Sequence, residues 1–246
     1  MRILILSDIH ANWEALQAVA EDAQGQFDES VCLGDLVGYG ASPGEVVDWV
    51  RANMGSVIRG NHDKAVARLD PMEDFNILAR SAVHWTRETL TAAQMNYLRA
   101  LPEGPLIRDD VSLAHGSPLD EDEYLLSIQD VLEIPSQLPG MVCFVGHTHI
   151  QGGFLWERGR PERLIRPAAQ DREAVLKLAP ATFHLLNPGS VGQPRDGDPR
   201  AGYVIYETVS RTVHFRRVTY DVARAQRKIL EAGLPELLAG RLGLGR

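Results

Sequence analysis

The sequence predicts an α/β protein, and three observations carry the prediction. Short apolar runs rich in leucine and β-branched residues recur along residues 3–145, and each has the length of a buried strand. Segments with apolar residues at helical spacing lie between several of these runs. The last third carries strand-like runs joined by tight turns, which is typical of antiparallel pairing. Strand–helix alternation favours βαβ units and a mainly parallel central sheet, within a single domain over residues 1–246.

The first five predicted strands each end in a polar cluster, and glycine flanks most of these clusters. These strands lie at residues 3–6, 31–33, 57–58, 111–114 and 141–145, and three more are expected at 182–186, 203–207 and 212–218. We expect the last three to form hairpins. Residues 159–180 contain Arg, Glu and three prolines, and we expect them to form an exposed loop.

The helices are predicted from apolar stripes and from end signals. They cover residues 13–23, 43–51 and 74–89, a segment that opens with a capping box at 91–94, and residues 221–230 with Gly233 as the stop. The helices within about 64–104 are expected to form an insertion, and the C-terminal helix is expected over about 221–233.

Bulk properties exclude several classes of protein. The formal net charge of -8 argues against broad nucleic-acid binding, because phosphate contacts need Lys and Arg. No apolar run approaches the roughly 18 residues of a membrane span, and the N-terminal run is too short for a signal peptide. Cys32 and Cys143 lie inside apolar runs and are expected to be buried thiols. We therefore expect a cytoplasmic protein without membrane segments, and the oligomeric state is left open.

Polar side chains gather directly after the strand-like runs. They are Asp8, His10, Asp35, Asn61, His62, His115, His147 and His149. Ligands of open α/β sheets bind beyond the carboxyl ends of strands, so these distant clusters can converge on one site. In an extended chain, residues two apart such as Asp8 and His10 point the same way. Carboxylate oxygen and imidazole nitrogen suit Mn, Fe, Zn or Ni better than Ca. Asp35 has two oxygens and could bridge two such cations.

Five motifs occur in order along the first 150 residues. They are Asp8-x-His10, Gly34-Asp35, Gly60-Asn61-His62-Asp63, His115-Gly116 and Gly146-His147-x-His149. Together they resemble the signature of the calcineurin-like metallophosphoesterase superfamily. The later Asn187-Pro188-Gly189-Ser190-Val191-Gly192 resembles the smaller bacterial and archaeal phosphodiesterase branch, which extends the resemblance to about residue 220. The resemblance implies a metallophosphoesterase sandwich of two packed mixed β-sheets flanked by α-helices.

The resemblance also implies a role for each cluster. A first metal would take Asp8, His10, Asp35 and His149, and a second would take Asp35, Asn61, His115 and His147. The metals would be two divalent transition-metal ions, with Mn ahead of Fe, Zn or Ni. A hydroxide that bridges them would hydrolyse a phosphate ester of a small molecule or nucleotide, with a diester preferred. His62 is the expected general acid, Asp63 would orient it, and Asn61 counts among both the ligands and the catalytic residues.

Alternatives stay open for several residues. Asp63 could be a turn or helix-start residue, and Asn12 could support the site or begin the following helix. Arg195 could bind a substrate phosphate through two hydrogen bonds, or it could be a solvated loop arginine. His84, His184 and His214 fall outside the motifs, and we expect them to have no part in the site.

Alternatives stay open for the function as well. The chain could be a phosphomonoesterase or protein phosphatase, a dinucleoside-polyphosphate hydrolase, a nuclease, or a binding scaffold without turnover. The ligand set is complete, which argues against a scaffold, and the acidic chain argues against a nuclease. Residues 70–104 are expected to shape one wall of the substrate pocket.

Overall fold

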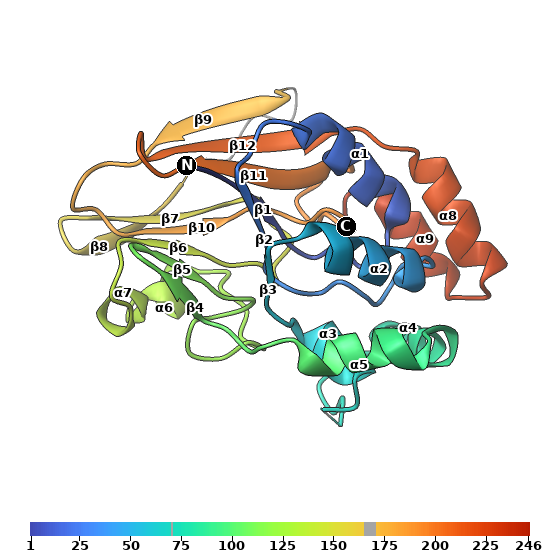
Figure 1. Ribbon diagram of the computed structural model, residues 1–246. Helices are drawn as coiled ribbons and strands as arrows, with labels where there is room; N and C mark the ends of the chain where they lie inside the picture. The colour runs from blue at the N-terminus through green and yellow to red at the C-terminus, as the bar shows by residue number, and fades with distance from the viewer. Residues whose placement is uncertain (70, 165–170) are drawn as a thin grey trace.

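The computed structural model describes residues 1–69, 71–164 and 171–246. Within these residues, two six-stranded sheets pack against each other and helices cover their outer faces (Figure 1). Strand β1 (Arg2–Leu6) shows why two layers form. Its side chains alternate: Ile3 and Ile5 enter the core between the sheets, whereas Leu4 and Leu6 enter the core shared with the helices. The predicted sandwich of two mixed sheets is confirmed.

The first sheet has the order β3-β2-β1-β11-β12-β9. Its other strands are β2 (Glu29–Cys32), β3 (Ser56–Val57), β9 (Glu173–Lys177), β11 (Ala201–Glu207) and β12 (Thr212–Val218). β1, β2 and β3 run parallel, and the remaining neighbours pair antiparallel. Leu6 pairs with Cys32, so the chain leaves β1 and β2 at the same edge.

The second sheet has the order β4-β5-β6-β10-β7-β8. Its strands are β4 (Leu106–Arg108), β5 (Val111–Leu113), β6 (Val142–Phe144), β7 (Gly152–Glu157), β8 (Arg160–Arg163) and β10 (His184–Asn187). β5, β6 and β10 run parallel, and the other pairs are antiparallel. The parallel strands of this sheet again end side by side.

The helices begin at the residues that cap them. They are α1 (Trp13–Ala23), α2 (Pro43–Asn53), α3 (Asn61–Val66), α4 (Ile77–Thr89), α5 (Ala92–Ala100), α6 (Ile128–Val131), α7 (Ile134–Gln137), α8 (Val222–Glu231) and α9 (Glu236–Leu242). Thr91 and Gln94 form the predicted capping box of α5, and the Asp221 side chain accepts from the amide of Arg224 to begin α8. The helices predicted from the sequence do not include α6, α7 or α9.

Three predictions about the strands are wrong. Neither sheet is mainly parallel, since antiparallel strands complete both. Residues 159–180 are not one loop: they contain β8 and β9, and residues 165–170 lie outside the described part. Both strands are sheet edges, where a proline such as Pro161 and many polar side chains are tolerated. β11 and β12 form the expected hairpin, but β10 joins the other sheet beside β6.

Two smaller expectations concern membrane-spanning helices and the state of the cysteines. No helix in the described ranges is long and apolar enough to cross a membrane. Cys32 and Cys143 are free, buried thiols in the core, as predicted.

Candidate metal centre

The loops after β1 and β2 stay hydrogen-bonded beyond the strands. The amide of Asp8 donates to the carbonyl of Gly34 (3.0 Å), and the amide of His10 donates to the carbonyl of Asp35 (2.9 Å). This continued pairing keeps the side chains of Asp8, His10 and Asp35 next to one another at the carboxyl edge of the first sheet.

The second sheet delivers its polar residues to the same edge. β5 and β6 are parallel neighbours, and the amide of Gly146 donates to the carbonyl of His115 (2.7 Å). The two sheets are joined across the site because the amide of His147 donates to Asp8 Oδ2 (3.1 Å). Residues far apart in sequence therefore converge, as the positions of the polar clusters predicted.

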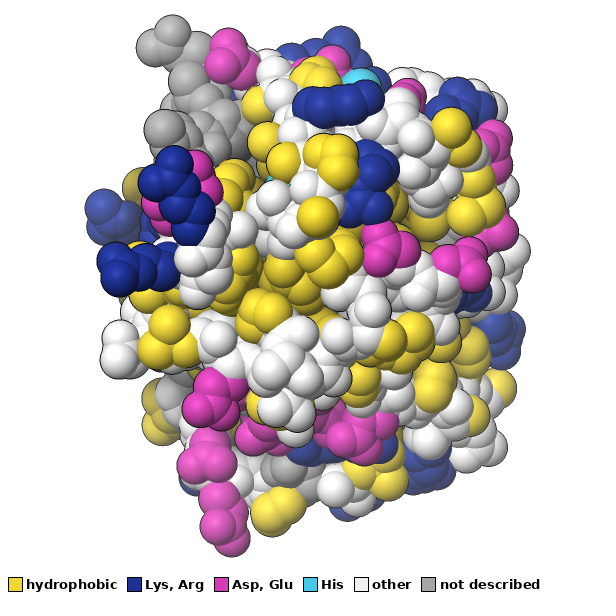
Figure 2. Space-filling view, turned by 90° about the vertical axis from the view of Figure 1, so that its left-hand side faces the viewer, with side chains coloured by type: hydrophobic (Ala, Val, Ile, Leu, Met, Phe, Trp, Pro, Cys, Tyr) yellow, Lys and Arg dark blue, Asp and Glu magenta, His cyan; other side chains and the backbone are white. Residues whose placement is uncertain are grey.

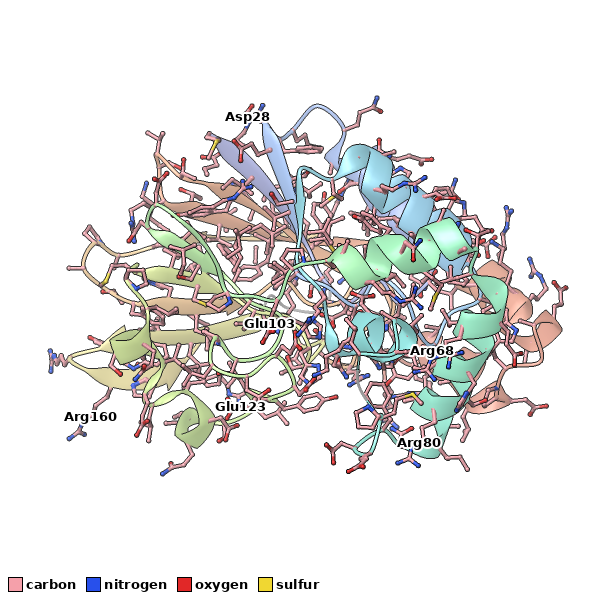
Figure 3. All side chains as sticks on the ribbon, turned by 60° about the horizontal axis from the view of Figure 1, so that its bottom comes forward. Asp28, Arg68, Arg80, Glu103, Glu123 and Arg160 are labelled. Atoms are coloured by element: carbon pink, nitrogen blue, oxygen red, sulfur yellow. The ribbon has the colours of Figure 1, made fainter. Side chains whose placement is uncertain are left out.

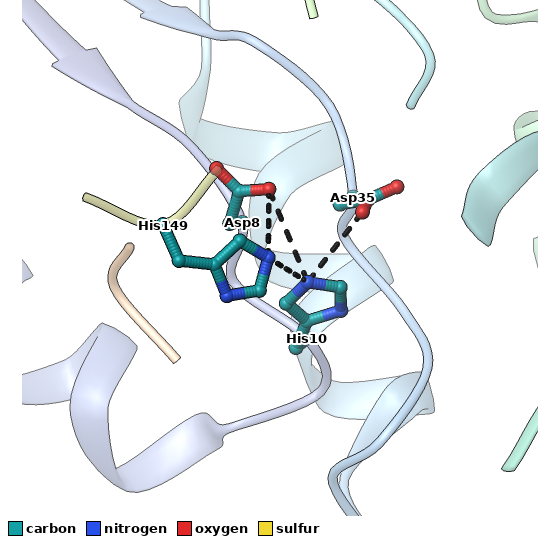
Figure 4. Close-up of side chains that lie close together, drawn as sticks. All are labelled: Asp8, His10, Asp35 and His149. Carbon is teal, nitrogen blue, oxygen red and sulfur yellow. Dashed lines mark hydrogen bonds and ion pairs between the residues drawn. The ribbon is translucent and has the colours of Figure 1, made fainter. Parts of the chain in front are cut away.

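A first group of potential ligands consists of Asp8, His10, Asp35 and His149 (Figure 4). All four are buried, and one ligand atom from each lies within 4.8 Å of the others. His149 Nε2 is 3.3 Å from Asp8 Oδ1, and His10 Nε2 is 3.5 Å from Asp35 Oδ2. Two carboxylates and two imidazoles thus surround one point.

The hydrogen bonds of the two imidazoles show that this point suits a cation. His10 Nδ1 donates to the carbonyl of Val37 (3.0 Å), and His149 Nδ1 donates to the carbonyl of Gln193 (2.6 Å). Burial holds the pKa of both histidines below the usual range, so each ring is neutral and its Nε2 carries a lone pair. The two Nε2 atoms are 3.1 Å apart with no proton between them. A metal ion removes this repulsion, and backbone carbonyls hold metal-binding histidines in this way.

A second group lies on the other side of Asp35. Asp35 groups with His115 and His147, and all three are buried. Asp35 Oδ2 is 3.5 Å from His115 Nε2, the same distance that separates it from His10 Nε2. Asn61 Oδ1 lies 3.2 Å from His115 Nε2. One carboxylate oxygen therefore faces both groups, as a bridging ligand must.

His115 and His147 reach the second group through different nitrogens. His115 Nδ1 donates to the carbonyl of Leu33 (2.9 Å), which leaves Nε2 toward the site. His147 Nε2 donates to the carbonyl of Asp122 (3.1 Å), which leaves Nδ1 as its lone-pair atom. Burial acts to lower the pKa of His115, but Asp35 and Asp8 outweigh it and raise the pKa to about 10. A metal at this position would compete with that proton.

The backbone around the site adopts an uncommon conformation. Asp8, His10, Asp35, His147 and His149 all have φ between 48° and 62°. For residues other than glycine, this left-handed conformation costs about 1–2 kcal/mol each, and residues that adopt it are frequent at functional sites. The expectation that an extended chain aligns these pairs is wrong, because compact left-handed turns bring the side chains together instead.

Two glycines make room for the carboxylates. A Cβ on Gly60 would lie 2.2 Å from Asp35 Oδ1, and one on Gly146 would lie 2.8 Å from Asp8 Oδ2. Neither position has space for a larger residue, which explains why glycine precedes both polar motifs.

His62 lines an open pocket beside the two groups. Its ring lies 4.9 Å from that of His10 and 4.5 Å from that of Tyr39, measured between centroids. Nδ1 is shielded from solvent and has no partner among the described residues. Burial lowers the pKa of His62 to about 4, so the ring is neutral at pH 7 in the structure described.

Asp63 does not orient His62, which corrects that expectation. Its Oδ1 accepts from the amide of Leu36 (2.9 Å), and its Oδ2 accepts from the amide of Gly60 (3.0 Å). Burial and the nearby Asp35 raise the pKa of Asp63 to about 7. The carboxylate ties the loop that carries Asp35 to the start of α3, so its position fits the helix-start alternative.

The pocket has a volume of about 120 Å³ and contains aromatic side chains that were not predicted from the sequence. Tyr124 is 44% exposed and stacks on His147, with ring centroids 3.8 Å apart. Phe75 and Asn76 line the opposite part, so the segment 70–104 does contribute a wall, although Asp70 lies outside the described residues. No local pattern marks Tyr39 or Tyr124, because loop packing alone brings them here.

Arg195 lies at the rim of the same site. Its guanidinium stands 5.8 Å from the centroid of the Tyr39 ring, and its backbone amide donates to the carbonyl of His149 (3.1 Å). Arg195 Nε is shielded and has no hydrogen-bond partner, and no described carboxylate forms an ion pair with this residue. An anion bound at the site would meet an unneutralised cation.

Asn12 fits both of its alternatives. Its Oδ1 accepts from the amide of Ala15 (3.1 Å) at the start of α1, and its Nδ2 donates to the carbonyl of Gly192 (2.8 Å) in the turn beside the site. The remaining histidines lie elsewhere. His84 is exposed on α4, His184 bonds the carbonyl of Thr182, and His214 pairs with Glu173.

Comparisons with known proteins agree with this geometry. Residues 1–211 match the family described as "Calcineurin-like phosphoesterase superfamily domain". A metallophosphoesterase from Sphaerobacter thermophilus is 39% identical, and its crystal structure covers 100% of this chain and 99% of its own with a TM-score of 0.85. An uncharacterized protein of Methanocaldococcus jannaschii is 36% identical over 99% of this chain and 98% of its own length. A hypothetical protein from Pyrococcus horikoshii, 20% identical, shares the fold with a TM-score of 0.79 over 100% of this chain and 98% of its own. The chain belongs to the calcineurin-like phosphoesterase superfamily, whose members use divalent metals, and it is a metal-dependent hydrolase of phosphate esters.

Proposed function

We propose that this chain is a phosphodiesterase with two divalent transition-metal ions. Asp8, His10, Asp35 and His149 would hold the first ion, and Asp35, Asn61, His115 and His147 the second. The position of Asp35 Oδ2, 3.5 Å from both His10 Nε2 and His115 Nε2, is the observation that carries the proposal. Imidazole-rich sites of this kind suit Mn, Fe, Zn or Ni, and we favour Mn.

The bound ions would activate a water and neutralise the phosphoryl oxygens. Arg195 has an unpaired Nε donor and no carboxylate partner among the described residues at the rim, and it would hold an oxygen of the same phosphate. His62 lines the pocket and would protonate the leaving oxygen, because the negative charge of a bound phosphate favours the protonated imidazole.

A diester is preferred over a monoester for two reasons. The Asn187 to Gly192 turn resembles the phosphodiesterase branch, and it braces the site: Ser190 Oγ donates to the carbonyl of Asp8 (2.7 Å). The pocket beside His62 is also open and partly aromatic, so it offers room for a second ester group. Two free buried thiols support a cytoplasmic location.

The experiment is a panel of substrates and metals. The protein is reconstituted separately with Mn, Fe, Zn and Ni, and its metal content is measured by elemental analysis. Bis(p-nitrophenyl) phosphate, p-nitrophenyl phosphate and a dinucleoside tetraphosphate are then compared. We expect two ions per chain and the highest kcat/KM for the diester. His84→Gln, far from the pocket, is the matched control and should behave as wild type. One ion per chain, or monoester hydrolysis without diester hydrolysis, would contradict the proposal.

A further inference from the structure

The two sheets leave a hollow at the end opposite the metal centre. The candidate ligands follow the carboxyl ends of β1 and β5, whereas the hollow lies at the amino ends of these strands. Its volume is about 140 Å³, which is below the roughly 300–1,000 Å³ of pockets for drug-sized ligands and therefore suits only a small molecule. The turn between β4 and β5 and the turn between β11 and β12 form its mouth.

The walls of this inter-sheet hollow are apolar. They are formed by Ile3, Ile5, Val31, Val111, Leu113 and Tyr206, all of which are less than a tenth exposed. Figure 2 shows apolar side chains gathered in the middle of one end face of the molecule, with Lys and Arg side chains beside them. An apolar concavity next to positive charge favours a ligand that has both an apolar body and a polar head.

Arg211 is the positive group with unused hydrogen-bonding capacity. Its Nη1 donates to Asp110 Oδ2 (2.6 Å), but Nε and Nη2 are shielded from solvent and have no partner in the described structure. Nε and Nη2 lie on one edge of the guanidinium. Through this edge an arginine can bind a carboxylate with two parallel hydrogen bonds. Leaving such buried donors unpaired destabilises the protein, so an acceptor that pairs them is favoured.

The other charged side chains at the mouth leave this role to Arg211. Arg108 is already engaged, because its Nη1 donates to Glu29 Oε2 (2.9 Å) and its Nη2 donates to Ser56 Oγ. Asp109 is exposed to solvent, and Asp110 neutralises only the Nη1 end of Arg211.

We propose that the inter-sheet hollow binds a small amphipathic carboxylate. The hydrocarbon or aromatic body would occupy the space between the sheets, in contact with Val111 and Leu113. A rotation of the flexible Arg211 side chain would turn its Nε and Nη2 edge onto the carboxylate. This second site is independent of the phosphoesterase site, and binding there needs no metal.

The test compares two probes that share a tail and differ in the head group. Binding of octanoate and octanol to the full-length protein is measured by calorimetric titration or by NMR chemical shifts. We expect wild type to bind octanoate at least about tenfold more tightly than octanol. Arg211→Met keeps the length and apolar stem of the side chain and should bind both probes equally. Val111→Phe fills the hollow and should weaken both.

The matched control is Arg160→Met. Arg160 is an exposed arginine on the β7–β8 hairpin, at the far edge of the second sheet (Figure 3). It should leave the preference for octanoate unchanged. Thermal melting and phosphodiester hydrolysis show whether each variant is folded. Equal binding of the two probes to wild type, no binding of either, or a preference that survives in folded Arg211→Met would overturn the proposal.

Discussion

Asp35 lies where the loops of the site meet. Its Oδ1 accepts from the backbone amide of His62 (2.8 Å), while Oδ2 lies 3.5 Å from the Nε2 atoms of His10 and His115. His62 has a different kind of position. Its ring packs between Tyr39 and Phe75 and makes no hydrogen bond with Asp35 through its side chain. The two residues should therefore fail in different ways when they are replaced.

His62→Gln should keep both metals and slow turnover according to the leaving group. A general acid contributes about 10²–10⁴-fold, so the loss should be large for an alkoxide leaving group. It should shrink for p-nitrophenolate, which departs readily as an anion. The measurement is a leaving-group series on diesters, with metal content checked in parallel.

Asp35→Asn is the comparison for this series, and it should lose metal occupancy and activity for every substrate. If the loss in His62→Gln at full metal occupancy does not depend on leaving-group basicity, His62 positions the substrate and does not donate the proton.

At the scale of residues, the sequence predicted which side chains gather but not how. Asp8, His10, His147 and His149 could be found because their motifs follow apolar strands. Their left-handed backbone could not, since it depends on hydrogen bonds between loops that are distant in sequence. The position of Asp63 was misjudged for the same reason: the amide of Leu36 that it holds comes from another loop.

At the scale of elements, strands made of continuous apolar runs were predictable, whereas the partly exposed strands β4, β7, β8 and β9 were not. β1 and β6 are continuous apolar runs, because helices or a second sheet cover each face. β9 alternates between exposed and half-buried side chains, so its sequence does not differ from that of a loop. The pairing of β10 was also unpredictable, since the sequence of a single strand does not determine which sheet it joins.

One ion-pair cluster connects the elements around the site. Arg59 precedes α3, and its Nε and Nη2 donate to both oxygens of Glu121 at 2.7–3.2 Å. Glu121 lies in the segment after β5 and is only 8% exposed. This pair therefore holds the loop of Asn61 against the loop that follows His115.

Glu121→Gln should lower the free energy of unfolding at pH 7 by about 1–3 kcal/mol, as expected for a buried, charge-assisted hydrogen bond. Burial acts to raise the pKa of Glu121, but Arg59 and Lys64 outweigh it and lower the pKa below 4.5. A lowered carboxyl pKa stabilises the fold above the unfolded pKa, and this contribution is lost as pH falls through the folded pKa. Denaturant unfolding of both proteins from pH 7 to pH 3 should show the difference shrinking below about pH 4.5.

The matched control is Glu103→Gln. Glu103 pairs with the same arginine, at 2.7 Å from its Nη2, but its side chain is 60% exposed. An exposed ion pair contributes about 0–1 kcal/mol, so this variant should be close to wild type at every pH. Equal effects of the two substitutions would mean that burial does not govern this cluster.

At the scale of the whole molecule, the metal centre connects the two sheets. Asp8 and Asp35 come from loops of the first sheet, and His115 and His147 come from loops of the second. The carboxylates are buried at this junction: burial acts to raise their pKa, but the neighbouring histidines outweigh it and hold the pKa of Asp8 and Asp35 below the usual range. Without cations, the junction is held by protonated His115 beside the two carboxylates and by the hydrogen bond from the amide of His147 to Asp8. Bound metal should therefore stabilise the fold as well as supply the chemistry.

Removal of metal with a chelator should lower the melting temperature of the whole chain. At free metal about 100-fold above Kd for both sites, binding stabilises the native state by about 2.7 kcal/mol per ion, or about 5.4 kcal/mol for two ions. For a chain of this size, each kcal/mol corresponds to about 2–4 °C, so a shift of about 11–22 °C is expected. Calorimetric melting of metal-loaded and chelated protein, with metal content measured in each, checks this. Asp35→Asn should abolish the shift, and Glu103→Gln should retain it. If loaded protein with two ions melts at the same temperature as chelated protein, the centre does not hold the sheets together. The charge of the buried carboxylates must then be balanced by protonated His115 without loss of stability.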